Sequence, residues 1–296
     1  MDLKAGEVAV VTGAASGIGL ALAHRFAQAG LRIAMVDVEV ERLNEAVEAV
    51  AATGAEAVGF TCDVRTADAV NDLATRVVEQ FGGVQILCNN AGVADTGDPW
   101  FGPIESWDWV LGVNFYGVVH GVRAFLPHLF GGGHIINTAS MAGLFPGLSP
   151  IYDASKHAVV ALTENLYHQM NLIEAPIGVS CLCPGWVRTG IFDAERNWPA
   201  ELGQRPESSP VVETVKGHLE RAIAEGLTPA AVADLVVDAV TENRFWVFPH
   251  PDWLEMAADR WQLVAEGTNP EPPNSVPGMP PRDQLAAEIR TALGLG

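Results

Sequence analysis

Short apolar runs alternate with longer amphipathic segments along most of the chain. The runs are typical of β-strands buried on both faces, and the longer segments repeat apolar residues at helical spacing. Strands are predicted at Val8–Val11, Arg32–Asp37, Ala57–Thr61, Val84–Cys88, His134–Thr138, Ile177–Cys183 and Phe245–Phe248. Helices are predicted at Gly17–Ala29, Glu41–Thr53, Ala67–Phe81, Ser106–Leu129, Tyr152–Asn171 and Pro229–Asn243.

This alternation predicts an α/β fold. We expect one Rossmann-like, doubly wound parallel sheet of about seven strands, with helices on both faces, over residues 1–250. A C-terminal extension over residues 251–296 follows, packed on this domain or on a neighbouring subunit. It contains two helical patterns, Trp253–Glu266 and Arg282–Leu293, joined by the proline-rich segment Asn269–Pro281.

The composition excludes several classes of protein. Acidic side chains number 36 against 17 Lys and Arg, so the formal charge of the 296 residues is −19. Nucleic-acid binders and polybasic membrane-surface proteins need excess Lys and Arg, so neither partner is expected. Apolar residues make up 49%, which excludes a disordered chain, and no run reaches the roughly 18 apolar residues of a membrane span. Four cysteines are too few for a disulfide scaffold, and we expect a cytoplasmic protein.

The first predicted strand runs directly into a glycine-rich loop that opens a helix. From Thr12 to Gly19 the chain reads TGAASGIG. A pyrophosphate binds backbone N–H groups at a helix N-terminus, where side chains would block its approach. Gly13 permits the tight turn, Gly17 the close approach, and Gly19 the packing of helix on strand. A loop of this kind between a strand and a helix predicts a dinucleotide site.

An acidic residue at the end of the second predicted strand discriminates between dinucleotides. Asp37 lies 18 residues after Gly19, where a carboxylate accepts hydrogen bonds from the adenosine ribose. Its charge repels a 2′-phosphate, and no Lys or Arg stands in the loop or at Val38 to neutralise one. NAD is therefore favoured over NADP. Asp63, after the third strand, is expected either to meet the adenine or to close a local Asx turn.

A tyrosine and a lysine share one face of a predicted helix. Tyr152 and Lys156 are one helical turn apart, and an adjacent ammonium favours the phenolate and lowers the tyrosine pKa from its usual value near 10. Such a pair suits general acid–base work on an alcohol or a carbonyl. Ser140 follows the fifth strand, at the edge where ligands bind in these sheets, and its hydroxyl can hold a substrate oxygen. It lacks the Gly-x-Ser-x-Gly context of a hydrolase nucleophile.

Together these motifs make the sequence similar to the classical short-chain dehydrogenases/reductases over about residues 5–250. The resemblance rests on the glycine loop, Asn89-Asn90-Ala91-Gly92, Asn114, Ser140, Tyr152, Lys156 and Pro184-Gly185. It implies a catalytic tetrad of Asn114, Ser140, Tyr152 and Lys156. In alcohol oxidation Tyr152 would take the proton and Ser140 would hold the substrate oxygen. Lys156 would lower the Tyr152 pKa and bind the nicotinamide ribose, and with Asn114 it would relay the proton outward through water.

The same resemblance implies a set of cofactor contacts. The Val187 backbone and the Thr189 hydroxyl would hold the carboxamide, and Asn90 and Gly92 would support the central strand and the ribose. The implied cofactor-binding residues are Gly13, Ser16, Gly17, Ile18, Gly19, Asp37, Asp63, Val64, Asn90, Gly92, Tyr152, Lys156, Pro184, Gly185, Val187 and Thr189. No metal is expected.

The substrate side carries aromatic residues and few charges. The family places a mobile lid after Thr189, and here this segment, about Gly190–Lys216, is long and without clear secondary structure. Residues expected to wall an apolar pocket are Leu144, Phe145, Trp186, Phe192 and Trp198. Apart from Arg188, no Lys or Arg stands ready to grip a carboxylate or phosphate. A neutral, bulky, apolar or aromatic secondary alcohol, or its ketone, is the expected substrate.

The favoured function is therefore an NAD-dependent oxidoreductase that interconverts a secondary alcohol and its ketone. The alternatives are an NADP-dependent carbonyl reductase, a non-catalytic dinucleotide sensor or scaffold, and a sugar-nucleotide epimerase or dehydratase. The complete tetrad argues against a sensor, and an extension of about 45 residues is small for the substrate domain of an epimerase. The resemblance also implies that the two longest helices pair between subunits, as a homodimer or homotetramer.

Overall fold

Parallel strands form a single sheet at the centre of this computed structural model, which describes residues 2–147 and 149–295. The strand order is β3 (Ala57–Thr61), β2 (Arg32–Asp37), β1 (Val8–Thr12), β4 (Ile86–Asn89), β5 (Gly133–Thr138), β6 (Ile177–Leu182) and β7 (Trp246–Val247). The chain moves outward from β1 to β3 and returns on the other side of β1 as β4. Ligands bind outside the carboxyl ends of the strands at such a reversal. The predicted Rossmann-like fold is confirmed.

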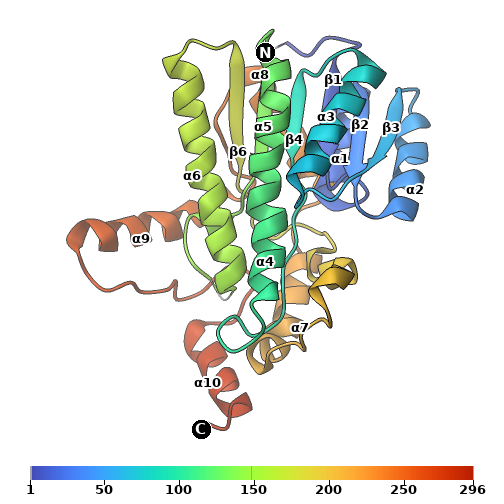
Figure 1. Cartoon of the computed structure of the whole chain (residues 1–296). Helices are drawn as coiled ribbons and strands as arrows, with labels where there is room; N and C mark the ends of the chain where they lie inside the picture. The colour runs from blue at the N-terminus through green and yellow to red at the C-terminus, as the bar shows by residue number, and fades with distance from the viewer. Residues whose placement is uncertain (1, 148, 296) are drawn as a thin grey trace.

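Helices cover both faces of the sheet (Figure 1). One face carries α1 (Gly17–Gln28), α2 (Val40–Ala51) and α8 (Pro229–Glu242), and the other carries α3 (Ala67–Phe81), α5 (Gly117–Leu129) and α6 (Pro150–Leu172). In β1, Ala9 and Val11 pack into the first core, whereas Val8 and Val10 pack into the second. Each fully buried Val contributes about 1.5–3 kcal/mol. This two-sided burial explains why the strands read as continuous apolar runs.

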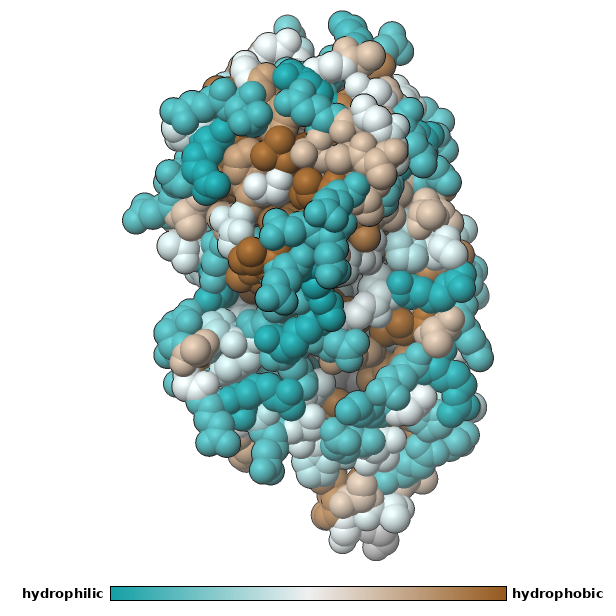
Figure 2. Space-filling view, turned by 90° about the vertical axis from the view of Figure 1, so that its right-hand side faces the viewer, coloured by the Kyte–Doolittle hydropathy of each residue, from teal (hydrophilic) through white to brown (hydrophobic). Residues whose placement is uncertain are grey.

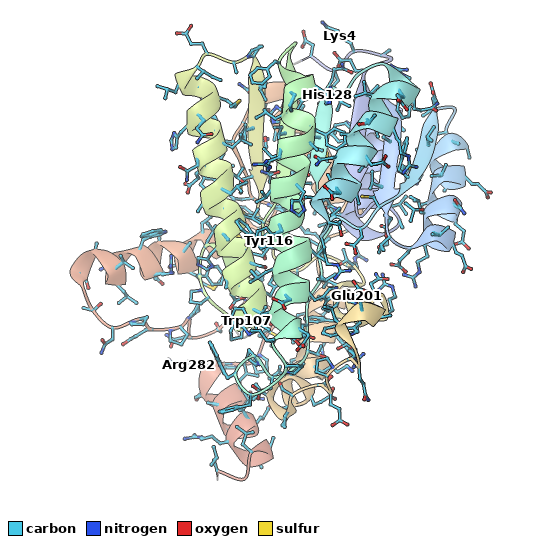
Figure 3. All side chains as sticks on the ribbon, viewed as in Figure 1. Lys4, Trp107, Tyr116, His128, Glu201 and Arg282 are labelled. Carbon is cyan, nitrogen blue, oxygen red and sulfur yellow. The ribbon has the colours of Figure 1, made fainter. Side chains whose placement is uncertain are left out.

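The helix predicted over Ser106–Leu129 is interrupted at its midpoint. It divides into α4 (Glu105–Leu111), a π-helical turn over Gly112–Tyr116, and α5. Figure 3 shows Tyr116 at this midpoint. The π turn carries Asn114, which is fully buried. Wide turns of this kind occur frequently at functional sites because they redirect one side chain.

The lid is more ordered than its sequence suggested. We predicted no clear secondary structure over Gly190–Lys216, and this is wrong for its last seven residues, which form the start of α7 (Pro210–Ala224). The Ser209 hydroxyl accepts a hydrogen bond from the Val212 N–H at 3.2 Å and caps the helix, and Pro210 occupies its first turn. Short 3₁₀ turns at Ile191–Asn197 and Ala200–Leu202 precede it.

The C-terminal extension contacts the domain at both of its ends. After β7, a 3₁₀ turn at Pro251–Trp253 leads into α9 (Leu254–Glu266), which projects from the body (Figure 1). The chain then returns, and α10 (Arg282–Ala292) packs against α7. Within the described ranges, no helix has both the length and the apolarity to cross a membrane.

Candidate active site

A cleft of about 610 Å³ lies between the carboxyl edge of the sheet and the lid. Figure 2 shows an indentation at mid-height of one side of the molecule, with hydrophobic residues near its rim. Every predicted cofactor-binding residue except Gly19 lines the cleft. So do Ser140, Tyr152 and Lys156 of the predicted tetrad, whereas Asn114 lies behind its wall. One continuous cleft therefore joins the glycine loop to the Tyr–Lys pair.

The glycine loop forms a cradle that side chains would fill. A Cβ on Gly19 would overlap the Gly13 carbonyl oxygen, and a Cβ on Gly13 would lie 2.9 Å from the Ala91 Cα. Gly13 and Gly17 have φ of +67° and +55°, a region that favours glycine. The Ser16 side chain does not cap α1, so the first N–H groups of this helix stay available to an anion. These features fit a dinucleotide pyrophosphate, with Gly19 serving the packing of α1.

Asp37 stands at the rim of this cradle. Its carboxylate accepts hydrogen bonds from the Ala15 N–H at 2.9 Å and from the Glu39 N–H at 3.0 Å. Local sequence indicated that no cation approaches here, but the fold brings one from the lid. Arg196 forms a two-point ion pair with Glu39, with Nη2–Oε1 at 2.7 Å and Nε–Oε2 at 3.0 Å. The Arg196 guanidinium lowers the pKa of Glu39, and Glu39 raises the pKa of Arg196.

Asp63 closes a local turn, as one of the two readings of the sequence predicted. Its Oδ1 accepts a hydrogen bond from the Arg65 N–H at 3.0 Å, and its Oδ2 pairs with the Arg65 guanidinium at 2.5 Å. Arg65 also pairs with Glu201 of the lid at 2.6 Å. Figure 3 shows Glu201 on the lid at the side that faces the β3 edge of the sheet. The lid is thus held to the cofactor side at two points, Arg196–Glu39 and Glu201–Arg65.

The predicted reacting groups come from two neighbouring elements. Ser140 follows β5, and its hydroxyl accepts a hydrogen bond from the Ala142 N–H at 3.1 Å and donates one to the Pro184 carbonyl at 3.3 Å. Tyr152 and Lys156 both lie on α6. The Lys156 ammonium donates to the Thr138 carbonyl at 2.9 Å and lies 5.5 Å from the centre of the Tyr152 ring.

Burial controls the ionisation of this pair. It raises the pKa of Tyr152 to about 12, while a hydrogen bond with Ser140 works in the opposite direction. It lowers the pKa of Lys156 to about 8, because an ammonium is costly away from water. Burial therefore sets the net direction of the Tyr152 pKa shift, opposite to the decrease expected from the sequence. The predicted proximity of Lys156 to the Tyr152 ring is present, and the effect of its ammonium on the Tyr152 pKa stays a prediction.

Asn114 joins three elements behind the cleft. Its Oδ1 accepts from the Val93 N–H at 2.8 Å, and its Nδ2 donates to the Val93 carbonyl at 2.9 Å and to the Ser155 hydroxyl at 3.1 Å. A Cβ on Gly92 would lie 3.5 Å from the Asn114 Oδ1 and 3.6 Å from the Lys156 Nζ. Gly92 therefore separates Asn114 from Lys156 with little more than backbone.

The other motif residues tie the strand ends together. The Asn90 amide donates to the Thr12 carbonyl at 3.0 Å and accepts from the Thr138 hydroxyl at 3.3 Å, so it links the ends of β1, β4 and β5. The Gly185 N–H donates to the His250 Nδ1 at 3.0 Å. A Cβ on Gly185 would lie 3.0 Å from the Trp253 ring, so this position accepts the first residues of the C-terminal extension at close range.

The substrate half of the cleft is walled by apolar side chains. All four aromatic residues of the predicted pocket, Phe145, Trp186, Phe192 and Trp198, line the cleft, whereas Leu144 is not among the lining residues. The structure adds lining residues that the sequence reading missed, namely Val211, Val212, Val215, Leu219 and Ile223 of α7 together with Trp253, Val276 and Met279 of the extension. The Ser209-Pro210 helix start was a usable signal for α7. No local pattern pointed to Val276 or Met279.

Comparisons with known proteins agree with this geometry. A family model described as short chain dehydrogenase matches residues 7–200. The 1-deoxy-11-beta-hydroxypentalenate dehydrogenase of Streptomyces avermitilis is 35% identical over 267 residues, covering 87% of this chain and 90% of that protein. The C alpha-dehydrogenase of a Sphingobium species is 31% identical over 279 residues, covering 89% and 87%.

A solved structure extends the agreement to the fold. The crystal structure of a short-chain dehydrogenase/reductase from Burkholderia phymatum in complex with NAD superimposes with a TM-score of 0.89 at 40% identity. It covers 93% of this chain and 100% of that one. With the glycine cradle, the parallel sheet and the Ser140–Tyr152–Lys156 arrangement, these matches show that the chain belongs to the short-chain dehydrogenase/reductase family and is an oxidoreductase.

Proposed function

We propose that this oxidoreductase uses NAD to interconvert a neutral, apolar or aromatic secondary alcohol and its ketone. The observation that carries the proposal is the position of Ser140, Tyr152 and Lys156, which meet in the same cleft that begins at the glycine cradle. The Burkholderia relative with NAD bound supports the cofactor. A substrate oxygen placed between Ser140 and Tyr152 would find a hydrogen-bond donor and a proton acceptor together.

The protein's part in the reaction is proton transfer and orientation. Ser140 holds the substrate oxygen, and Tyr152 takes the hydroxyl proton in oxidation or donates a proton to the carbonyl oxygen in reduction. Bound NAD supplies the acceptor for the hydride of the alcohol carbon. The Lys156 ammonium stabilises the negative charge that develops on the Tyr152 oxygen. Asn114 is a positioning residue that fixes Val93 and Ser155, and we expect Lys156 to pass the proton on toward solvent.

Charge in the cleft argues for a neutral substrate. Among the described residues, the Lys and Arg side chains that line the cleft are Arg65, Lys156 and Arg196. Both arginines are paired with carboxylates of Asp63, Glu201 and Glu39. Lys156 is buried and directed at the Thr138 carbonyl. A carboxylate or phosphate on the substrate would therefore have no unpaired cation in the apolar half of the cleft.

The ion pair between Arg196 and Glu39, together with Asp37, supports NAD over NADP as the cofactor. Asp37 and Glu39 place two carboxylates at the adenosine end of the cleft, and the guanidinium of Arg196 is already held by Glu39. A 2′-phosphate would meet the Asp37 charge and would have to compete for Arg196.

Tyr152→Phe tests the catalytic assignment. Because Phe has no proton to exchange, NADH formation should fall about 10³-fold across a panel of secondary alcohols, while NADH binding, followed by fluorescence, stays within twofold. Tyr167→Phe is the matched control, since it removes a hydroxyl from the same helix outside the cleft. Full turnover in Tyr152→Phe would remove this residue from the mechanism. NADH binding by the wild type without turnover of any alcohol would favour the sensor alternative.

Asp37→Ala tests the cofactor assignment. Removal of this carboxylate should lower the ratio of kcat/KM with NAD to kcat/KM with NADP by about tenfold, because the ribose contact and the repulsion of a 2′-phosphate are lost together. Glu41→Ala is the control, since it removes an exposed carboxylate nearby in α2. An unchanged ratio in Asp37→Ala would contradict the predicted ribose contact.

A further inference from the structure

The proline-rich part of the extension forms a closed loop rather than a loose tail. We call residues 274–282 the C-terminal strap. The Arg282 N–H donates to the Asn274 carbonyl at 2.9 Å and closes the loop at its base. Within it, the Met279 N–H donates to the Val276 carbonyl at 2.9 Å, and Gly278 adopts a φ of +81° that makes this turn tight.

Two anchors hold the strap against the lid and the sheet edge. The Trp186 indole N–H donates to the Pro277 carbonyl at 2.7 Å, and Trp186 directly follows the Pro184-Gly185 motif. On the far side, α10 packs on α7, where Leu285 is buried and His218 Nε2 lies 3.1 Å from the Glu288 carboxylate. The strap is therefore held at Pro277, near its middle, and at its C-terminal end by residues that wall the cleft or support its wall.

The strap turns its apolar side chains inward. Val276 and Met279 are half-buried and line the cleft, whereas their neighbours Ser275, Pro277 and Gly278 are exposed. The facing wall of the cleft consists of Trp186, Trp253 and the apolar residues of α7. A segment that closes a pocket places its apolar side chains toward the pocket and its other residues toward solvent. A linker that is exposed all round would not show this alternation.

We propose that the C-terminal strap is the specificity-determining wall of the substrate pocket, where Val276 and Met279 set the size of the apolar group that a secondary alcohol can carry. The proposal rests on the proposed function for the identity of the reacting group. It assigns the substrate class as a neutral alcohol whose larger substituent is apolar and reaches away from Tyr152 to the strap. Met is suited to such a wall because its unbranched, polarisable side chain adapts to different apolar shapes.

Changing the volume at position 279 tests this directly. The probes are 2-butanol, 2-octanol, 1-phenylethanol and 1-(2-naphthyl)ethanol, each with NAD. Met279→Trp fills the space and should lower kcat/KM for the naphthyl alcohol at least tenfold, while 2-butanol stays within twofold. Met279→Ala opens the space and should raise the naphthyl-to-butyl ratio about tenfold, since one missing or extra methylene in an apolar pocket changes kcat/KM about 10–200-fold. Val276→Phe should act in the same direction as Met279→Trp.

The control lies on the same extension. Leu293→Ala removes an exposed apolar side chain beyond α10 that does not line the cleft, and its substrate profile should match the wild type. The NADH dissociation constant should stay within twofold in every variant, because the strap does not touch the cofactor half. Identical size profiles in wild type, Met279→Ala and Val276→Phe would overturn the proposal, and so would equal changes in Leu293→Ala.

A binding measurement separates this proposal from the proposed function. Trp186 and Trp253 line the pocket, so quenching of protein fluorescence reports alcohol binding without turnover. If the wild type binds the alcohols with a size preference that depends on position 279 but forms no NADH, the strap proposal stands and the proposed function fails. If the wild type turns the alcohols over with a size preference that the strap variants leave unchanged, the reverse holds.

Discussion

Backbone atoms form the cofactor half of the cleft, whereas side chains form the substrate half. The cofactor half is made of backbone, where a Cβ on Gly19 would overlap the Gly13 carbonyl oxygen and a Cβ on Gly13 would meet Ala91. The substrate half is made of side chains, which include those of Phe145, Trp186, α7 and the strap. A backbone cradle tolerates almost no change, whereas a wall of side chains can be altered one residue at a time. The substrate preference can therefore vary while the cofactor site stays constant.

Two ion pairs connect these halves. Arg196 and Glu201 of the lid pair with Glu39 and Arg65, which line the predicted cofactor end of the cleft. Both pairs are partly exposed, so each contributes modestly to stability. We expect these pairs to slow cofactor release, because a cofactor beneath the lid would leave only after the pairs have opened.

The largest expected effect comes from adding one methyl group to the cofactor half, with a methyl group at an exposed position of α7 outside the cleft as the control. Gly19→Ala should abolish NADH binding, by more than 10³-fold or through loss of the fold, because α1 can no longer pack on the loop. Gly217→Ala should leave kinetics unchanged and raise the free energy of unfolding by about 0.5–1 kcal/mol, since it replaces glycine in an exposed helical position. NADH fluorescence titration and thermal unfolding measure both. Tight NADH binding by Gly19→Ala would contradict the claim that the backbone of the cofactor half tolerates almost no change.

Lys156→Met should change turnover and the stability of the fold in opposite directions. Turnover should fall about 10²-fold or more, because the positive charge beside Tyr152 is lost. At pH 7 the fold should gain about 1–2 kcal/mol, since burial lowers the Lys156 pKa to about 8 from 10.5 in the unfolded chain, and the loss of the bond to the Thr138 carbonyl offsets part of the gain.

The sign of the pH dependence follows from proton counts. Between pH 8 and 10.5 the unfolded chain still holds a proton that folded Lys156 has released, so wild-type stability rises with pH through this window relative to Lys156→Met. The gap in Tm between the two proteins should be widest at pH 7 and narrow by pH 9.5. A variant less stable than wild type at pH 7 would show that the buried ammonium is compensated by interactions beyond Thr138.

The smallest effect concerns the fastening of the lid. Arg196→Gln removes the two-point pair with Glu39 and should speed NADH release about fivefold in stopped-flow measurements, corresponding to about 1 kcal/mol. Arg205→Gln is the matched control, because Arg205 pairs with Glu195 inside the lid and does not reach the cofactor edge. The difference between the variants should shrink in 1 M salt. Equal release rates in both variants would show that the lid opens independently of this pair.

The motifs were readable because each is local. The eight residues from Thr12 to Gly19 contain the whole strand–loop–helix turn, and Tyr152 and Lys156 share a face of one helix whatever surrounds them. The seven strands were located to within two residues at each end, since strands buried on both faces need continuous apolar runs. The apolar character of Phe145, Trp186, Phe192 and Trp198 was equally evident.

Other features depended on partners far away in the chain. Burial by the whole fold raises the pKa of Tyr152 where local charge suggested a decrease. A guanidinium reaches the Asp37 edge only because the lid folds across the cleft.

Sequence by itself determined the family and the parallel sheet, and it predicted the dinucleotide cradle and the reacting residues, because short-range geometry is enough to specify them. Tertiary structure decided how the substrate half closes. The contact of Trp186 with Pro277 joins residues 91 positions apart, and the pair of Arg196 with Glu39 joins residues 157 apart. Contacts at such separations exist only after the chain has folded, since no periodicity or local motif links the residues that make them.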